Sequence, residues 1–543
     1  MSTLIHRLIE KLRSRESIAE IRRHERSKCG FSAELRSYDI QINRRACEDK
    51  TVKELARNAL ASLSRADLVE HRSYVNGSWE TGHAKMGVID PATGDVIAQI
   101  DMLSGYKADA AVDAAQDAFE DWRELLPGAR GAILRRWAAL LRGNSEDLSV
   151  IITSEQGKPI KESRSEVEYA ANFLDWFAAE GERTYGETIP SHLAASRLSV
   201  TWQAIGVTAA VTPWNFPIAM ITRKAGAALA AGCTMIVKPA PETPLSALAI
   251  AKLADEAGMP AGVFQVINGD SVDLSKRLLE APKVRSFSFT GSTEVGRLLL
   301  RHSAETVKKV SMELGGHAPF IVFDDASLDA AIKGCVGAKF ATSGQDCLAA
   351  NRIYVQRSIY AKFVERFSDA VKELKVGHGL DPSSDIGPMT RRSVSAKCRD
   401  QIGQAVSAGA RVVLGGGYSS LGDQFIPPTI LADVADDMDI ANEETFGPVA
   451  AILPFDTEAE VLLRANNSEY GLAAYVYTSS LNRAMRMSDH LEYGMVAVNT
   501  PKFTGAPIPF GGWKQSGLGR EGSRYGMADY MEQKYTCFGN LKD

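Results

Sequence analysis

The stretch VTAAVTPWNFPIAMITRKAGAALAAGCTMIVK, residues 207–238, decides the fold because it holds a strand, a helix and a second strand in succession. Val207–Val211 and Thr234–Val237 are short apolar runs, which predict two buried strands. Ala219–Ala231 lies between them and is long and rich in alanine, which predicts a tightly packed helix. The stretch therefore predicts one parallel strand–helix–strand unit.

The same alternation of strands and helices extends along most of the chain. It continues through Leu245–Ala257 (helix), Val263–Ile267 (strand), a helix from Leu274 and Ser286–Phe289 (strand). A second series is expected from about Ala318 to Asn499, with strands near Phe320–Val322, Arg352–Val355, Arg411–Leu414 and Ala450–Phe455. This pattern predicts the α/β class with a doubly wound, mostly parallel sheet, which binds its ligands at the carboxyl ends of the strands.

Different elements are expected on either side of these alternating segments. Tyr74–Trp79 contains an Asn-Gly turn typical of a hairpin, and Val88–Ala98 predicts a second hairpin. Mostly helical sequence follows from about Lys107 to Glu180. The tail Asp529–Phe538 alternates like an edge strand and is expected to pair with another sheet.

The bulk composition excludes several classes of protein. At 543 residues the chain is long enough for two or three domains, and its net charge of −5 argues against nucleic acid as the main partner. No apolar run reaches the roughly 18 residues that a membrane span needs. Seven scattered cysteines without a Cys-x-x-Cys pair argue against a disulfide framework and a zinc site. We therefore expect a cytoplasmic protein without a metal.

Residues 1–70 differ from the rest because they are rich in arginine and poor in glycine. Apolar residues at helical spacing, such as Leu4, Ile5, Leu8 and Leu12, predict an accessory helical extension. A translation start assigned too far upstream would also explain this segment. A docking or regulatory segment is the alternative. Acidic residues lie among the arginines, which disfavours a mitochondrial targeting peptide.

Three residues form a candidate catalytic set. Cys347 follows Gly344 and Gln345, which suit an exposed turn where a thiolate could attack a carbonyl. Glu313 ends a strand-like run and precedes two glycines, so a pocket could raise its pKa and make it a base for water. Asn215 lies between two prolines and could donate its amide to an oxyanion.

Two strand ends are candidates for a nucleotide site. Lys238 ends one strand and could reach a ribose hydroxyl or a phosphate. Phe289–Ser292 ends another strand and opens a helix, whose N-terminus suits a pyrophosphate. Residues 517–522 match Gly-x-Gly-x-x-Gly but follow a polar loop instead of a strand, so we do not expect a phosphate loop there.

Seven ordered motifs carry a family resemblance that covers roughly Tyr74 to Phe538. They are TPWNFP, KPA, FTGS, ELGG, GQxC, EETFGP and PFGG, and this set resembles the aldehyde dehydrogenase superfamily. Ile221–Leu229 and Ser516–Ser523 are most similar to the succinate-semialdehyde dehydrogenase (NAD(P)+) family. The resemblance implies a doubly wound cofactor-binding domain, an α/β catalytic domain and a small oligomerisation β-sheet in a homodimer or homotetramer.

The resemblance also implies domain limits and residue roles. After the extension at 1–70, the domains are expected at 71–315 (NAD(P)-binding, interrupted by oligomerisation strands about 184–204), 316–515 (catalytic) and 525–543 (oligomerisation strand). Cys347 is similar to the nucleophile, Glu313 to the base and Asn215 to the oxyanion donor, with Lys224 and Glu521 as a proton relay. The implied cofactor contacts are Thr212, Pro213, Trp214, Lys238, Pro241, Gly291, Ser292, Leu314, Glu444 and Phe446.

The chain departs from the family pattern around the substrate. Typical relatives have Arg where this chain has Ala341, so one anchor for a substrate carboxylate is missing. Arg223 matches the family pattern and still indicates an anionic substrate. Lys502 or Thr504 could replace the contact that the missing arginine would make. Asp346 would repel an anion unless it pairs with Arg223 or Lys502.

Two further departures concern the cofactor and redox control. Pro241 stands where NAD-preferring relatives often carry Glu, so NADP or both cofactors are expected, unless Glu242 points inward. Ala349 stands where some relatives have a second cysteine, so we expect no redox-switch disulfide.

The favoured function is therefore NAD(P)-dependent oxidation of succinate semialdehyde or a related ω-semialdehyde to the acid. The thioester is expected to be hydrolysed by water that Glu313 activates, not transferred to coenzyme A. The first alternative is a dehydrogenase for a neutral aliphatic or aromatic aldehyde. A cysteine hydrolase and a non-catalytic scaffold are more distant alternatives.

Overall fold

The computed structural model describes residues 58–541, which belong to one compact unit, Glu54–Asp543. Most of the expected N-terminal extension lies outside the described residues. The described part of it forms two short 3₁₀ turns, Leu60–Ser62 and Ala66–Leu68, and Leu68 is fully buried. The globular chain thus begins before the first hairpin.

The first sheet has eight strands in the order β2-β1-β9-β8-β7-β10-β11-β21. The five strands from β9 to β11 are parallel, which confirms the doubly wound prediction. Asn76 and Gly77 both have positive φ in the predicted hairpin turn. The strands are β1 (Ser73–Val75), β2 (Ser78–Glu80), β7 (Val207–Val211), β8 (Thr234–Lys238), β9 (Phe264–Val266), β10 (Val284–Thr290), β11 (Lys309–Glu313) and β21 (Gly517–Leu518).

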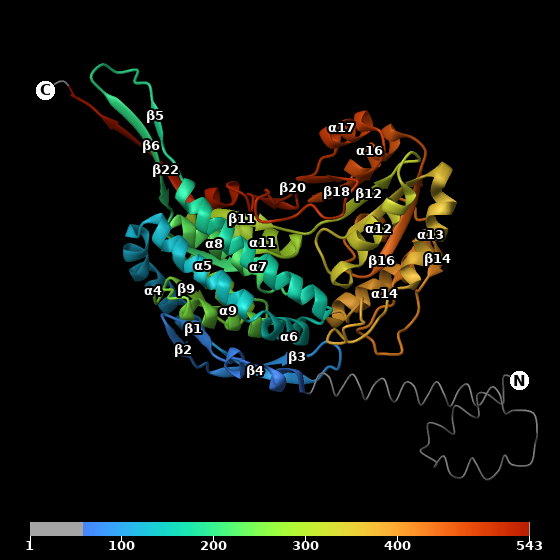
Figure 1. Cartoon of the computed structure of the whole chain (residues 1–543), viewed down its shortest axis with the longest axis horizontal. Helices are drawn as coiled ribbons and strands as arrows, with labels where there is room; N and C mark the ends of the chain where they lie inside the picture. The colour runs from blue at the N-terminus through green and yellow to red at the C-terminus, as the bar shows by residue number, and fades with distance from the viewer. Residues whose placement is uncertain (1–57, 542–543) are drawn as a thin grey trace, which may run out of the picture. The chain divides into compact units, whose positions relative to one another are not determined.

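Helices cover both faces of this sheet because its strands bury side chains on both sides (Figure 1). Val207 and Ile236 join the cluster that includes α4, whereas Ala210 and Met235 join the cluster around α8, as the alternation of a strand requires. The helices are α4 (Gly105–Glu124), α5 (Pro127–Gly143), α6 (Ser145–Gln156), α7 (Ile160–Glu180), α8 (Ala219–Ala231), α9 (Pro244–Glu256), α10 (Ser271–Glu280) and α11 (Thr293–Ser303).

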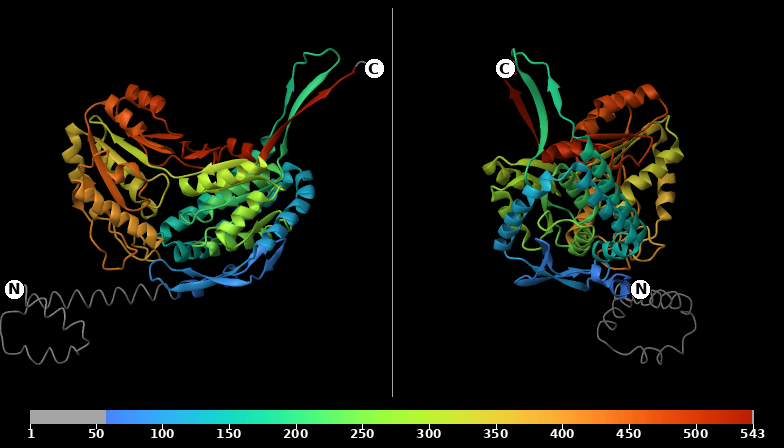
Figure 2. Two further views of the ribbon diagram at one scale, coloured as in Figure 1. Left: turned by 180° about the vertical axis from the view of Figure 1, so that it is seen from behind. Right: turned by 60° about the vertical axis from the view of Figure 1, so that its left-hand side comes forward.

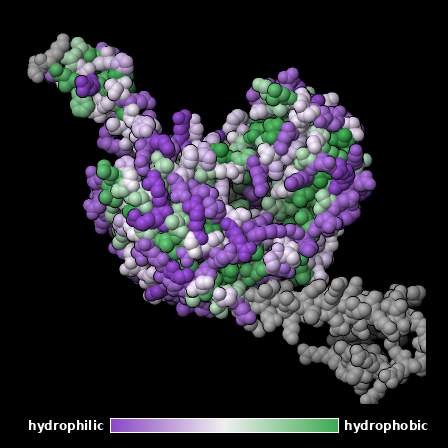
Figure 3. Space-filling model, in the orientation of Figure 1, coloured by the Kyte–Doolittle hydropathy of each residue, from purple (hydrophilic) through white to green (hydrophobic). Residues whose placement is uncertain are grey.

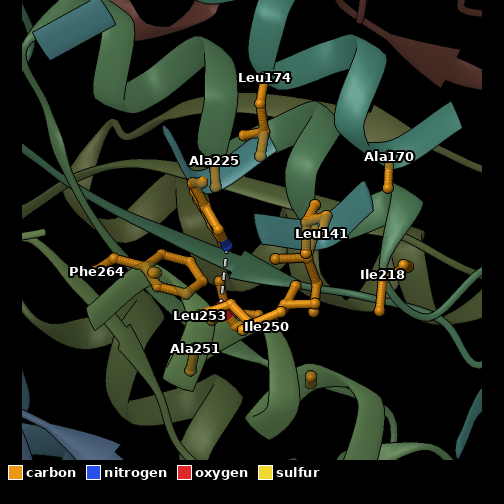
Figure 4. Close-up of a cluster of buried hydrophobic side chains, with 14 of the residues drawn as sticks. Leu141, Ala170, Leu174, Ile218, Ala225, Ile250, Ala251, Leu253 and Phe264 are labelled. Carbon is orange, nitrogen blue, oxygen red and sulfur yellow. Dashed lines mark hydrogen bonds between the residues drawn. The ribbon is translucent and has the colours of Figure 1, made fainter. Parts of the chain in front are cut away.

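The larger of the two clusters is packed from α5, α7, α8 and α9. Leu141, Leu174, Ile250 and Phe264 are fully buried and lie together in it (Figure 4). The indole N–H of Trp137 donates to the carbonyl of Ile250 at 3.0 Å, so the ring has a polar partner in an apolar core. This core holds α7 and α8 in place behind the site.

The second sheet has seven strands in the order β14-β15-β16-β13-β12-β18-β19, and only β14 is antiparallel to its neighbour. Its strands are β12 (Ala318–Val322), β13 (Ala350–Gln356), β14 (Arg411–Leu414), β15 (Thr429–Ala432), β16 (Val449–Phe455), β18 (Ala473–Tyr477) and β19 (Met495–Val498). The helices of this series are α12 (Leu328–Phe340), α13 (Tyr360–Lys372), α14 (Arg392–Ser407), α15 (Asp439–Asn442), α16 (Glu458–Asn466) and α17 (Leu481–His490). The predicted second α/β series is confirmed.

Three smaller sheets complete the unit. The hairpin β3 (Ala84–Ile89) and β4 (Val96–Met102) is confirmed, and β17 (Tyr470–Gly471) pairs with β20 (Trp513–Lys514). The strands β5 (Glu187–Ile189), β6 (Arg197–Ala204) and β22 (Met531–Phe538) form a ribbon that projects from the rest of this unit (Figure 2). The tail strand β22 pairs with β6 along its whole length, as its alternation predicts.

No helix in residues 58–541 is both long and apolar enough to span a membrane. Within the same residues, no group of three or more His, Cys, Asp or Glu side chains is arranged to hold a metal ion.

Candidate active site

A cavity of about 1080 Å³ lies at the carboxyl ends of the parallel strands of the first sheet and is also lined by residues of the second series. The face drawn in Figure 3 is hollowed between these two parts of the unit. Most of the candidate residues line this cavity: Thr212, Pro213, Trp214, Asn215, Arg223, Lys238, Pro241, Gly291, Ser292, Leu314, Asp346, Cys347, Glu444, Phe446, Lys502 and Thr504. The geometry therefore brings together segments that are far apart in the sequence.

Three candidate residues lie outside the cavity lining. Glu313, Lys224 and Glu521 are buried next to it, and Arg223 connects Glu521 and Lys224 to the lining. The Gly-x-Gly-x-x-Gly segment, residues 517–522, does not line the cavity either; its first two residues form β21 at the edge of the first sheet.

In the nucleophile loop, residues 342–347, the segment 342–345 is buried where the sequence suggests an exposed turn. Gly344 and Gln345 are both inaccessible to solvent, so the exposed-turn prediction is wrong. Thr342, Ser343 and Gly344 all have positive φ, at 51°, 57° and 74°. A Cβ on Gly344 would lie 2.4 Å from the carbonyl carbon of Gly447, so only glycine fits there.

Side chains from distant elements hold this strained loop. Both carboxylate oxygens of Glu162, on α7, accept the N–H of Thr342 at 3.0 Å. The hydroxyl of Ser343 accepts the N–H of Gly387 at 2.8 Å, and the Asn215 amide donates to the carbonyl of Gln345 at 3.1 Å. Such contacts can maintain consecutive left-handed residues that would otherwise be unfavourable.

Cys347 is half-buried at the end of this loop. Burial raises the pKa of its thiol well above the ordinary value, and the neighbouring Asp346 carboxylate raises it further. Asp346 accepts the N–H of Leu348 at 3.0 Å and forms an ion pair with neither Arg223 nor Lys502. Of the two alternatives for Asp346, pairing with a basic side chain is not observed among the described residues, because its carboxylate caps the loop backbone instead.

Glu313 is 2% exposed, and neither of its carboxylate oxygens has a hydrogen-bond partner among the described residues. Burial raises the pKa of Glu313 well above its usual range, and the nearby Glu521 carboxylate acts in the same direction. A Cβ on Gly511 would lie 2.9 Å from one Glu313 oxygen, so glycine keeps room beside this carboxylate. A buried carboxylate without partners is suited to taking a proton from water.

Glu521 connects two basic side chains of α8. Its carboxylate pairs with the ammonium of Lys224 and, at 2.5 Å, with the Nε of Arg223. Although burial acts in the opposite direction, Lys224 and Arg223 hold the pKa of Glu521 below its ordinary value. The cluster thus has two cations and one ionised carboxylate.

The candidate nucleotide contacts extend along the cavity, from Glu444 close to Cys347 to Lys238 at the end of β8. Lys238 donates to the hydroxyl of Ser271 at 2.6 Å, and burial lowers the pKa of Lys238 to about 8. Glu444 accepts the N–H of Gly316 at 2.9 Å, and burial raises its pKa to about 7. Glu242 does not line the cavity but pairs with Arg391 at 2.6 Å.

Sequence reasoning missed several polar residues that line the cavity, among them Ser271, Glu162 and Tyr169. Ser271 lies at the start of α10, and Glu162 and Tyr169 lie on α7. The positions of Glu162, Glu166 and Tyr169 are four and three residues apart, so they share one helix face and could have been recognised as a polar stripe. No local signal connects Glu162 with Thr342, because 180 residues separate them.

A thiol, an amide donor and a buried carboxylate around a nucleotide-sized cavity define a cysteine-dependent enzyme that can handle a carbonyl. The aldehyde dehydrogenase family model matches residues 79–536. The chain belongs to the aldehyde dehydrogenase family, and it is an enzyme of that class with that fold.

Similar proteins of known name include several semialdehyde dehydrogenases. The chain is 50% identical to succinate-semialdehyde dehydrogenase [NADP(+)] GabD of Escherichia coli, over 88% of this chain and 99% of that protein. It is 49% identical to 3-sulfolactaldehyde dehydrogenase of Pseudomonas putida, over 89% and 100% of the two chains. The crystal structure of an aldehyde dehydrogenase from Brucella melitensis biovar abortus 2308 has a TM-score of 0.87 at 50% identity, over 88% and 99% of the two chains.

Proposed function

We propose that this enzyme oxidises an aldehyde that carries an anionic group, of the ω-semialdehyde class, to the carboxylic acid with NADP. The observation that carries the proposal is the placing of Cys347, Asn215 and the unpartnered Glu313 around one cavity. The names of the relatives support it, because they act on succinate, glutarate or sulfonated aldehydes.

The reaction assigns one task to each residue. The Cys347 thiolate attacks the aldehyde carbon, and the Asn215 amide donates to the oxygen that becomes negative. When bound, the nicotinamide cofactor supplies the hydride acceptor that turns the thiohemiacetal into a thioester. Glu313 takes a proton from the water that hydrolyses this thioester, and the Glu521–Lys224 pair is positioned to pass the proton on.

The lining residues fit a dinucleotide. The hydroxyls of Thr212 and Thr290 are buried at the cavity without hydrogen-bond partners among the described residues, so a ligand can satisfy them. A Cβ on Gly291 would lie 2.4 Å from the ring of Phe289, so glycine keeps this wall clear. Lys238 and Ser271 would hold the adenosine ribose, and Glu444 the nicotinamide ribose.

Two observations favour NADP over NAD. The cavity wall at Pro241 has no carboxylate that would repel a 2′-phosphate, and Glu242 is held by Arg391 instead. Lys238 adds a positive charge at the same end.

The basic side chains of α8 favour an anionic substrate. Arg223 and Lys224 together carry two positive charges against the single negative charge of Glu521. The Asp346 carboxylate, next to Cys347, acts against this positive charge. The aldehyde is therefore expected to keep its negative group away from Asp346.

The ribbon of β5, β6 and β22 is the proposed contact between copies in a dimer or tetramer. Tyr535 and Phe538 on β22 are 55% and 51% exposed, which is typical of a surface that another chain covers. A cytoplasmic location stays a prediction from the cysteine pattern. Light scattering on the purified protein tests the assembly, and a monomer would contradict it.

Absorbance at 340 nm with NADP and an aldehyde panel tests the function. We expect cofactor reduction with succinate semialdehyde, loss of activity in Cys347→Ala, and retention in Cys537→Ala, whose cysteine is exposed on β22. A tenfold preference for neutral aldehydes would support the first alternative. Ester hydrolysis without any cofactor reduction would support a cysteine hydrolase, and no activity at all would support a scaffold.

A further inference from the structure

We propose that Lys502, not Arg223, binds the anionic group of the substrate, and that a long or ring-containing apolar spacer separates this group from the aldehyde. The inference rests on the function proposed above and narrows its substrate class. It follows from the contacts of Arg223, the position of Asp346 and the free charge of Lys502.

Neighbouring groups occupy two of the three nitrogens of the Arg223 guanidinium, and two aromatic rings lie close to it. Its Nε pairs with Glu521 at 2.5 Å, and its Nη2 contacts the sulfur of Met220 at 3.0 Å. The rings of Phe510 and Phe173 lie 4.1 Å and 5.7 Å from its centre. A carboxylate anchor needs two parallel N–H groups on one free edge, and Arg223 does not offer such an edge.

Arg223 instead positions the loop that carries Lys502. Tyr169 lines the cavity together with Arg223 and Thr504. Burial raises the pKa of its hydroxyl, whereas the Arg223 guanidinium and the Thr504 side chain act in the opposite direction, as neighbours of that hydroxyl do. Thr504 is two residues from Lys502, and both line the cavity. Arg223 is therefore a positioning residue for this wall.

Asp346 makes the surroundings of the thiol unfavourable for an anion. Its carboxylate is adjacent to Cys347 and has no ion-pair partner among the described residues. The carboxylate of a short semialdehyde lies only a few bonds from the reacting carbonyl, so it would be repelled there. A longer spacer moves the negative group away from Asp346.

Lys502 differs from the other basic side chains that line the cavity. Arg223, Lys276, Arg391 and Lys397 pair with Glu521, Glu280, Glu242 and Glu443, and Lys238 donates to Ser271. Within residues 58–541, the ammonium of Lys502 has no acidic partner, and the side chain is exposed. It is therefore available to a ligand anion.

Small and apolar residues line the part of the cavity next to Lys502. Gly337, Ala338 and Ala341, at the end of α12, line the cavity together with Pro501. Tyr475 adds an aromatic surface to the same lining. An apolar spacer, including one with a ring, suits such a lining.

The test compares 4-carboxybenzaldehyde, benzaldehyde and succinate semialdehyde with the full-length enzyme and NADP. We expect kcat/KM for 4-carboxybenzaldehyde to exceed that for both other aldehydes. In Lys502→Met, the ratio of kcat/KM for 4-carboxybenzaldehyde to that for benzaldehyde should fall about tenfold, as the loss of one charged contact predicts. Lys362→Met, at an exposed site on α13, is the matched control and should keep the wild-type ratio.

A second variant separates anchoring from positioning. Arg223→Lys should lower kcat/KM for both benzaldehydes by similar factors, because it disturbs the wall and not the anion contact. The proposal is overturned if succinate semialdehyde is the best substrate, if Lys502→Met leaves the ratio unchanged, or if only Arg223→Lys changes it. Failure of all three aldehydes to reduce NADP or NAD would instead overturn the proposed function.

Discussion

The two ends of the cavity are built in different ways. The cofactor end is formed where β7, β8 and β10 stop, and its residues, such as Lys238 and Gly291, are fixed by hydrogen-bonded strands. The substrate end is formed by side chains of α7, the end of α12 and the loop around Lys502. The strands of the sheet thus hold the cofactor-binding residues, which every reaction of this class needs. Substitutions in the loops can change the substrate specificity without disturbing the sheet.

The largest expected effect concerns Glu313, which serves both ends. Glu313→Gln should lower kcat by about 10²- to 10⁴-fold for every aldehyde, because no group then takes the proton from water. The first turnover should persist as a burst of reduced cofactor in stopped-flow absorbance. Glu305→Gln, an exposed site, is the control. A loss confined to one aldehyde would place Glu313 in substrate binding instead.

At the cofactor end, Lys238→Met should weaken NADP binding by roughly 10- to 100-fold, because a charged hydrogen-bond donor is lost. Titration of NADPH fluorescence measures this directly, and KM for the aldehyde should change little. Lys333→Met, exposed on α12, is the matched control. Equal losses for cofactor and aldehyde would show that the two ends are not independent.

At the junction of the two ends, Glu162→Gln should lower kcat/KM by about tenfold, because one acceptor for the Thr342 N–H becomes a donor. At high pH, the Glu162→Gln substitution should instead stabilise the fold relative to the wild type. Burial raises the pKa of Glu162 to about 7, so folding favours the protonated carboxyl group. The stability that this proton contributes is fully present below the ordinary glutamate pKa and is lost as the pH rises towards about 7.

Melting temperatures between about pH 5 and 8 test this coupling. The wild type should lose more stability over this range than Glu162→Gln, which has no proton to release. Parallel curves for the two proteins would contradict the buried, raised-pKa state of Glu162.

The smallest effect is expected at the substrate end for Asp346→Asn. Besides burial, the Asp346 carboxylate raises the pKa of Cys347, so its removal lowers that pKa and increases the thiolate fraction. Alkylation of the enzyme by iodoacetamide at pH 8 should then become several-fold faster. An unchanged or slower rate would mean that Asp346 does not act on the thiol.

Local sequence patterns predict the cofactor end better than the substrate end. The strand β7 and the helix α8 have the predicted bounds, because apolar periodicity and Gly or Pro boundaries define them within a few residues. The cavity also collects the predicted motif residues, and the family resemblance identified their order. The roles assigned to these residues stay predictions.

Partners chosen by the tertiary fold could not be predicted. Asp346 caps its own loop instead of pairing with a base, Gln345 is buried, and Arg223 is occupied by Glu521 nearly 300 residues away. Each outcome depends on which side chains the packing brings together, and no short-range pattern contains that information. Glu162 was missed for the same reason.

The ribbon of β5, β6 and β22 has a consequence for the order in which the chain is made. More than three hundred residues separate the end of β6 from the start of β22. At about 5–20 residues per second, a ribosome needs roughly 15–65 s to deliver the missing strand. During that interval one edge of β6 has no partner from its own chain and is open to a neighbouring nascent chain. Loss of the last thirteen residues, which include all of β22, would make that interval permanent.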